Sequence, residues 1–137
     1  DIIYIRLHGL PMIPNRWFGE DESGNLIAAM GIEHVAAMEL SGSVIILANC
    51  YGAESPMVNE FYRAGARAVI AGSGPNYAST ERIVGADLLS ARIIEELLER
   101  RSPQAALSIA KAKMMMTAFR EADRDTLEFQ IMERQNE

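Results

Sequence analysis

A histidine and the single cysteine of this chain each stand close behind an apolar run, and glycine follows each within two residues. His8 comes directly after the run of residues 2–7, and Cys50 comes two positions after the run of residues 44–48. Neighbouring strands of a parallel sheet present the residues beyond their carboxyl ends to the same crevice. We therefore expect an imidazole beside a thiol, which is the minimum equipment for catalysis by a cysteine nucleophile.

The chemistry of such a pair is specific. An ordinary thiol is only slightly ionised at neutral pH, and an imidazole beside it favours the thiolate and later protonates the departing amine. Backbone N–H groups aimed at the developing oxyanion stabilise it, and we expect those of Gly9 and Cys50 to form this oxyanion hole. A cysteine that stands alone after a buried strand is usually a small inert hydrophobe. The equivalent placement of His8 and Cys50 favours the catalytic interpretation.

The elements that must position these residues alternate between strand and helix. We expect strands at residues 2–7, 44–48 and 66–71, a short edge strand at 25–30, and helices at 32–40, 56–63, 83–100 and 103 to about 120. Residues 10–24 are predicted to form a surface loop, and residues 126–133 are ambiguous between helix and strand. This alternation predicts an α/β fold, a three-layer sandwich around a mainly parallel sheet.

Four polar residues follow the second and third strands and are candidates for substrate binding. Glu54 and Ser55 come shortly after the cysteine, and Ser73 and Asn76 lie in the loop after residues 66–71. Turn chemistry and capping explain these residue types equally well. His34, inside a predicted helix, is an alternative base, although a histidine on a helix face is more often solvated or capping.

The loop at residues 10–24 has two further features. Trp17 and Phe18 are expected either to cover the crevice or to pack against a part of the protein upstream of this chain. The acidic run at residues 20–22 is expected either to attract a basic side chain or to be a solvated surface.

Composition limits the classes of partner and site. The net charge is −6 and no basic cluster extends beyond two adjacent arginines, so we expect neither nucleic acid nor an anionic membrane as a partner. A single cysteine excludes an intramolecular disulfide and a zinc site of several thiolates, and we expect no metal and no cofactor. The cellular location stays open, with the cytoplasm slightly favoured.

The chain resembles the caspase-like superfamily of cysteine peptidases (clan CD). The gingipain-like and CHAT-domain branches are closer than caspases, because Ala48 and Asn49 stand where the caspase signature has glutamine and alanine. The resemblance rests on the strand before His8-Gly9, on VIILANCYG at residues 44–52, on NEFYRAGARAVI at 59–70, and on residues 86–113 with SPQAAL at 102–107. It implies a caspase-like fold with His8 and Cys50 as the catalytic dyad and Gly9 in the oxyanion hole. It also implies a peptide or protein as the substrate, and other domains of a larger protein are expected as further partners.

Two departures from the family pattern accompany the resemblance. Domains of this superfamily carry further strands before the histidine strand, so we read residues 1–137 as a single caspase-like domain that continues upstream in a larger domain or protein. The loop after the third strand also lacks a tryptophan common in CHAT domains, so substrate preference does not transfer.

Two rival interpretations remain. The first is a catalytically inactive caspase-like or CHAT module that acts as a regulatory or scaffolding interaction domain. The second is an amidotransferase-type hydrolase, whose motif needs glycine two residues before the cysteine and a histidine downstream. Ala48 occupies the first of these positions, and no histidine follows Cys50.

Overall fold

A computed structural model describes residues 1–76, 79, 81–116, 128–132 and 134. Its larger sheet contains β1 (Ile2–Ile5), β5 (Val44–Leu47), β6 (Ala68–Ala71) and β7 (Gln130–Ile131), in the order β1-β5-β6-β7. The first three strands are parallel, and β7 runs antiparallel to β6. The prediction of an α/β fold with a mainly parallel sheet is confirmed.

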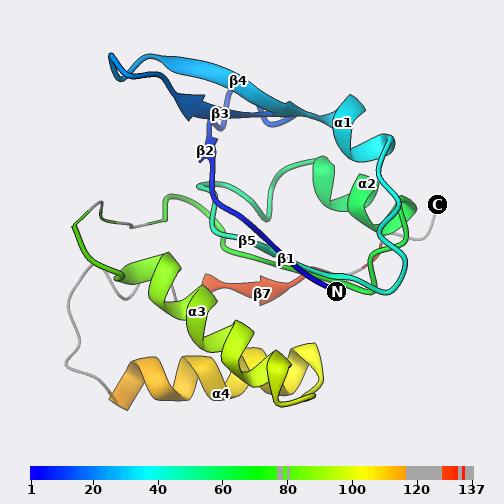
Figure 1. Cartoon of the computed structure of the whole chain (residues 1–137), viewed down its shortest axis with the longest axis vertical. Helices are drawn as coiled ribbons and strands as arrows, with labels where there is room; N and C mark the ends of the chain where they lie inside the picture. The colour runs from blue at the N-terminus through cyan, green and yellow to red at the C-terminus, as the bar shows by residue number, and fades with distance from the viewer. Residues whose placement is uncertain (77–78, 80, 117–127, 133, 135–137) are drawn as a thin grey trace.

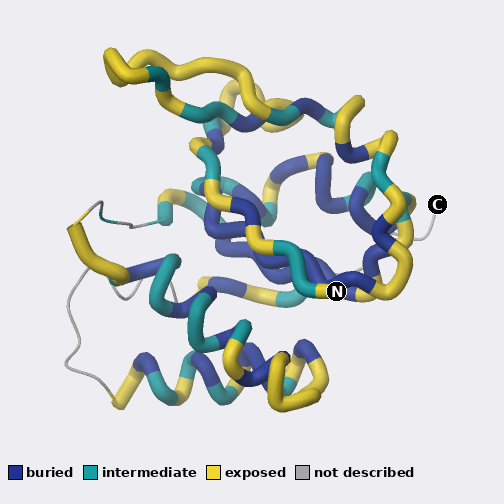
Figure 2. The backbone as a smooth tube through the Cα atoms, viewed as in Figure 1, coloured by how far each residue is buried: buried dark blue, intermediate teal, exposed yellow. Residues whose placement is uncertain are grey.

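Helices cover both faces of this sheet (Figure 1). The helices α3 (Gly85–Leu98) and α4 (Pro103–Met116) pack on one face, and α1 (Ile32–Ala36) and α2 (Met57–Arg63) pack on the other. All four residues of β5 and of β6 are buried, as expected of strands covered on both sides (Figure 2).

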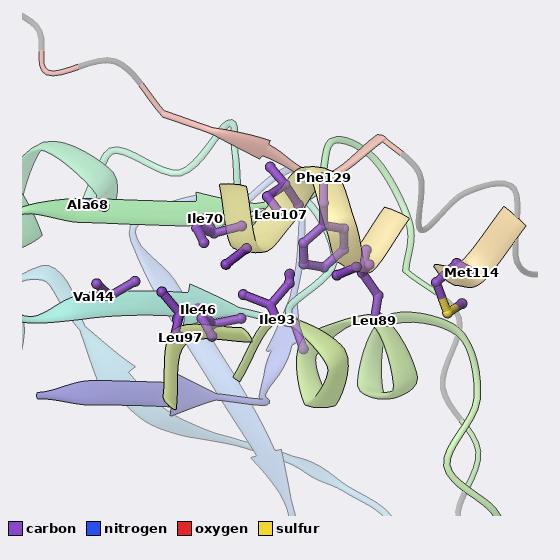
Figure 3. Close-up of a cluster of buried hydrophobic side chains, with 14 residues drawn as sticks. Val44, Ile46, Ala68, Ile70, Leu89, Ile93, Leu97, Leu107, Met114 and Phe129 are labelled. Carbon is purple, nitrogen blue, oxygen red and sulfur yellow. The ribbon is translucent and has the colours of Figure 1, made fainter. Parts of the chain in front are cut away.

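Alternate residues of the central strands supply two separate cores. Val44 and Ile46 of β5 pack with α3 and α4, where Phe129 completes the cluster (Figure 3). Ile45 and Leu47 point to the opposite face and pack with α1 and α2. The side-chain period of two in a strand is the reason that one short apolar run serves both cores.

A second sheet, which is antiparallel, lies beside the first, and the described residues form no other sheet. It contains β2 (His8–Gly9), β3 (Arg16–Glu20) and β4 (Leu26–Gly31), in the order β2-β3-β4. The edge strand expected at 25–30 is therefore found, but the predicted loop at 10–24 is wrong, because β3 lies within it. The predicted strand 2–7 also ends early, at Ile5.

Trp17 explains why a polar-looking segment forms a strand. Its side chain is only 1% exposed, and its ring stacks on that of Phe61 in α2 with centroids 6.0 Å apart. The indole thus anchors β3 to the core, and neither alternative proposed for Trp17 from the sequence describes this packing. Phe18, the next residue, points to the other side of the strand and lines a cavity described below.

Helix α1 is shorter than expected, and the last segment of the chain is described only in part. Helix α1 ends at Ala36 instead of residue 40, because the backbone N–H of Leu40 donates to the carbonyl of Ala64 and so leaves the helical pattern. Within the ambiguous segment 126–133, residues 130–131 form β7, and residues 126–127 and 133 lie outside the described residues. The expected end of the last helix, about residue 120, also lies outside them.

Among the described helices, none is both long and apolar enough to cross a lipid bilayer.

Candidate active site

His8 and Cys50 line the same cavity, which has a volume of about 470 Å³. The small sheet contributes His8, Phe18 and Glu20 to its wall, and the segment after β5 contributes Cys50. Asn76 enters from the loop after β6. The topology therefore brings together an imidazole, a thiol and a carboxylate from three separate parts of the sequence.

Asn49 ties the two strand ends to each other. It is fully buried, and its Oδ1 accepts a hydrogen bond of 2.9 Å from the backbone N–H of Leu7. Leu7 directly precedes His8, and Asn49 directly precedes Cys50. This bond holds the backbone segments of the two reactive residues side by side. Sequence reasoning missed this role, since nothing local distinguishes a buried tether from a turn asparagine.

The thiol of Cys50 rests on the backbone of Asn76. The N–H of Asn76 donates to Sγ at 3.2 Å, and Sγ lies 3.6 Å from the carbonyl oxygen of the same residue. The Asn76 side chain fixes this contact, because its Nδ2 donates to the carbonyl of Asn49 at 2.7 Å. Cys50 is half-buried. The N–H of Asn76 points at the sulfur and its carbonyl faces the S–H, so the two contacts hold the sulfur in place.

Further bonds hold the turn after Cys50 against the loop after β6. The N–H groups of Tyr51 and Ala53 donate to the carbonyls of Gly74 and Gly72, at 2.6 and 3.1 Å. In return, Glu54 accepts a hydrogen bond of 3.0 Å from the N–H of Gly74. Tyr51 has a φ of 56°, an unfavourable conformation for a residue with a side chain, and the surrounding bonds maintain it. The backbone around the cysteine is therefore held in one geometry.

Glu20, like Asn49, is a residue of this site that the sequence did not identify as part of it. His8 pairs with Phe18 across β2 and β3, so Glu20, two positions further on, lies on the same face. His8 Nε2 is 2.9 Å from Glu20 Oε1, and the two side chains are 51% and 54% exposed. The alternation of a strand at residues 16–20 is the signal that would have placed Glu20 there. The carboxylate fixes Nε2, which leaves Nδ1 for proton exchange.

Gly9 occupies a position where a side chain does not fit. A Cβ built on Gly9 would lie 1.9 Å from the carbonyl oxygen of Cys50. The close approach of these two backbones explains the glycine after His8. Within the described part of the chain, the N–H of Cys50 has no acceptor, which an oxyanion-hole donor requires. The corresponding role of the Gly9 N–H stays a prediction.

Of the four residues expected to bind substrate, the structure places only Asn76 on the cavity wall. Ser55 is buried, donates to the carbonyl of Pro14 at 2.7 Å and accepts from the N–H of Met57, so it holds a loop and the start of α2. Glu54 and Ser73 stand outside the lining; Glu54 holds the Gly74 turn, and Ser73 contacts Gln130.

The alternative base, His34, does not line the cavity. Its Nδ1 accepts a hydrogen bond of 2.9 Å from the N–H of Gly31, at the beginning of α1. This is the capping role that the sequence left open beside the catalytic one. Because Nδ1 accepts this hydrogen bond, His34 has a structural role at the start of α1.

A search of the described residues for metal-binding groups and comparisons with known proteins give no further indication of function. No group of three or more histidine, cysteine, aspartate or glutamate side chains among the described residues could hold a metal ion. Comparisons of the chain with family models, curated proteins and solved structures give no match. The geometry of the cavity is therefore what supports a function, and it supports thiol chemistry assisted by an imidazole.

Proposed function

We propose that the protein is a cysteine peptidase, or a peptidase-like hydrolase, with a His8–Cys50 dyad and a caspase-like fold. The observation that carries the proposal is that the cavity of about 470 Å³ is lined by both side chains. The mostly parallel sheet with helices on both faces supports the finer fold assignment. The resemblance of the sequence to the gingipain-like and CHAT-domain branches points the same way.

In the proposed reaction, the thiol proton of Cys50 passes to His8, and Sγ attacks the carbonyl carbon of a peptide bond. The oxyanion that forms accepts hydrogen bonds from backbone N–H groups, among which that of Cys50 is available. The C–N bond then breaks, and the amine leaves with a proton supplied by the imidazolium of His8. The product of this step is a thioester on Cys50 and a free amine.

Water then attacks the thioester while His8 accepts its proton. The C–S bond breaks, the carboxylic acid is released, and His8 returns its proton to Sγ, which restores the thiol. In both half-reactions His8 moves one proton, and we assign this transfer to Nδ1, because Nε2 faces Glu20 at 2.9 Å. The two side chains have no direct hydrogen bond in the part of the chain that the structure describes, and catalytic contacts often tighten only when substrate binds.

Glu20 is a positioning residue in this proposal. A carboxylate beside Nε2 orients the ring and favours the imidazolium that forms during the reaction. It performs this role from β3, the strand that Trp17 anchors in the core. The position of the base therefore depends on the pairing of β2 with β3.

The test measures the reactivity of Cys50 and the cleavage of peptides in parallel. Iodoacetamide labels the only cysteine of the chain, so one alkylation rate reports on the proposed nucleophile. We expect His8→Ala to slow alkylation at neutral pH by about 10-fold or more. The matched control is His34→Ala, which removes the only other histidine and should leave the rate unchanged.

Peptide cleavage decides between an enzyme and an inactive module. A peptide library analysed by mass spectrometry should reveal cleavage by the wild type and none by Cys50→Ala or His8→Ala. Equal alkylation rates in wild type and His8→Ala, together with cleavage that survives Cys50→Ala, would remove the peptidase proposal. Absence of cleavage by the wild type, together with equal alkylation rates, would favour the scaffolding interpretation.

A further inference from the structure

A second cavity of about 470 Å³ lies beside the first, between β1 and α3. The two cavities share Arg6 and Ser79 as lining residues. A group that enters the second cavity is therefore next to whatever occupies the first. This adjacency makes the second cavity a candidate subsite for part of the same ligand.

One face of α3 forms the wall of this second cavity. Asp87, Ser90, Ala91 and Ile94 recur at the helical spacing of three and four residues, and all four line it. Ser90 is only 1% exposed, and its Oγ has no hydrogen-bond partner among the described residues. A buried hydroxyl without a partner is costly, so it indicates a place where a ligand can supply the missing bond.

The charges around the cavity cancel each other. Asp87 Oδ1 accepts a hydrogen bond of 2.6 Å from the Tyr4 hydroxyl and lies 3.2 Å from Arg6 Nε. Burial and the adjacent Asp87 carboxylate raise the pKa of Tyr4, so its hydroxyl remains a donor at neutral pH. Glu81 and Arg82, both exposed, add one charge of each sign.

The rest of the lining includes aliphatic side chains. Ile83, Ala91 and Ile94 contribute apolar surface around Ser90. A charged group here would lose its hydration without meeting an unpaired opposite charge, because Asp87 already neutralises Arg6. An uncharged group loses little and gains both the apolar contacts and one hydrogen bond.

We propose that this second cavity binds an uncharged, mostly apolar side chain of the peptide substrate that carries one hydrogen-bonding group, such as the phenol of tyrosine. Ser90 Oγ pairs with that polar group, and the face of α3 contacts its apolar body. The inference deepens the proposed peptidase function and rests on it, because the occupant is part of a substrate whose scissile bond lies at Cys50.

Binding is tested first without any reaction. The phenol p-cresol is titrated into the Cys50→Ala protein and followed by NMR at the amides of Ser90 and Ala91, with n-butylammonium and butyrate as charged probes. We expect p-cresol to produce saturable shifts there, at least 10-fold tighter than either charged probe. Ser90→Ala should weaken the binding of p-cresol by about threefold to tenfold, the usual value of one neutral hydrogen bond.

Blocking the cavity has a matched control. Ala91→Trp places an indole in the cavity and should abolish the p-cresol shifts. Ala112→Trp adds the same group at an exposed position of α4 and should leave p-cresol binding unchanged. Tighter binding of a charged probe, or p-cresol binding that survives Ala91→Trp, would overturn the inference while leaving the alkylation test of His8 unaffected.

Cleavage then tests the role of the cavity in substrate recognition. A peptide library should be cleaved beside tyrosine or a similar uncharged residue, and Ala91→Trp should reduce this preference at least 10-fold. Cleavage confined to sites beside lysine, arginine, aspartate or glutamate contradicts the inference. If alkylation of Cys50 is independent of His8, the proposed function fails, and the substrate role of the cavity fails with it even when p-cresol binds.

Discussion

Two clusters of this protein each contain a glutamate beside basic side chains, and they differ in how far that glutamate is exposed. In the candidate active site, His8 and Glu20 are each about half exposed. Between α3 and α4, the Glu96 carboxylate is only 6% exposed and lies 2.5 Å from both Lys113 Nζ and Arg101 Nε. One cluster faces an open cavity, and the other lies between two packed helices.

The difference in exposure between Glu20 and Glu96 indicates what each cluster can do. An exposed pair exchanges protons with water, which suits a group that must gain and lose a proton in every turnover. A buried carboxylate with two cations holds the helices in a fixed relation, because separating the charges would leave one of them unpaired in a poorly solvated place. The buried cluster therefore fixes α3, and α3 forms the wall of the second cavity.

The largest effect is expected from Gly9→Ala, which would disrupt the contact between β2 and the Cys50 turn in the candidate active site. The added methyl group would clash with the Cys50 carbonyl, at 1.9 Å, so the two backbones must separate. We expect a loss of about 1–3 kcal/mol in the free energy of unfolding, and alkylation of Cys50 as slow as in His8→Ala. Urea unfolding and iodoacetamide labelling measure these two quantities.

Gly19→Ala is the stability control for this substitution. A Cβ at Gly19 would meet its nearest atom at 3.9 Å, an ordinary contact within β3. We expect its free energy of unfolding to stay within about 1 kcal/mol of the wild type, the usual range for exchanging glycine and alanine in a strand. Equal stability of Gly9→Ala and Gly19→Ala would contradict the close approach of β2 to the cysteine turn.

The next effect concerns the buried cluster and its pH dependence. A hydrogen bond from Lys113, with the charges of Lys113 and Arg101, lowers the pKa of Glu96 below its usual value of 4.5. The folded state therefore binds this proton less readily than the unfolded state does. The stabilisation is fully present above the unfolded pKa and is lost as the pH falls through the folded one.

Glu96→Gln should lower the urea midpoint at pH 7 and flatten its dependence on pH in the acidic range. Glu95→Gln, on the exposed side of the same helix, is the matched control and should keep the wild-type profile. Urea unfolding between pH 7 and pH 3 measures both. A Glu96→Gln profile as steep as that of the wild type would mean that the charge of Glu96 does not contribute to the stability of the buried cluster.

Glu20→Ala sharpens the comparison by altering reactivity with little effect on stability. We expect alkylation of Cys50 at neutral pH to slow by about 10-fold, because the imidazole loses its orienting partner. Glu20→Gln should restore part of the rate, since an amide oxygen still accepts a hydrogen bond from Nε2. A residue with only a structural role would not produce this order.

The exposed Glu22 supplies the control for Glu20. Glu22→Ala removes a charge of the same sign two positions away and should leave the alkylation rate unchanged. Thermal unfolding of all three variants should match the wild type closely, as exposed ion pairs contribute little. Equal slowing by Glu20→Ala and Glu22→Ala would assign the effect to general electrostatics instead of ring orientation.

The smallest effect is expected for an exposed pair on the same helix as the buried one. Arg92 Nη1 lies 3.1 Å from Glu95 Oε2, one helical turn away, and both side chains are open to solvent. Arg92→Ala should change the free energy of unfolding by only about 0.3–0.5 kcal/mol. Urea unfolding that registered a loss as large as that of Glu96→Gln would mean that burial is not what separates the two clusters.

Much of the secondary structure was predictable because its signals are local. The apolar runs that form β5 and β6 and the spacing of apolar residues in α3 all predicted elements that the structure contains. The pairing of β3 was not predictable in this way. Its segment is rich in polar residues, and its strand depends on pairing with β2 and β4 and on the stacking of Trp17 on Phe61.

The candidate site divides along the same line. The residue types and their places after apolar runs by themselves singled out His8, Gly9 and Cys50 as an imidazole, a small residue and a thiol. The structure alone decided that Glu20 stands beside the imidazole and that Ser55 is turned away into a loop contact. Burial periodicity is written in neighbouring residues, whereas cross-strand register and loop packing depend on contacts between distant ones, which local patterns do not contain.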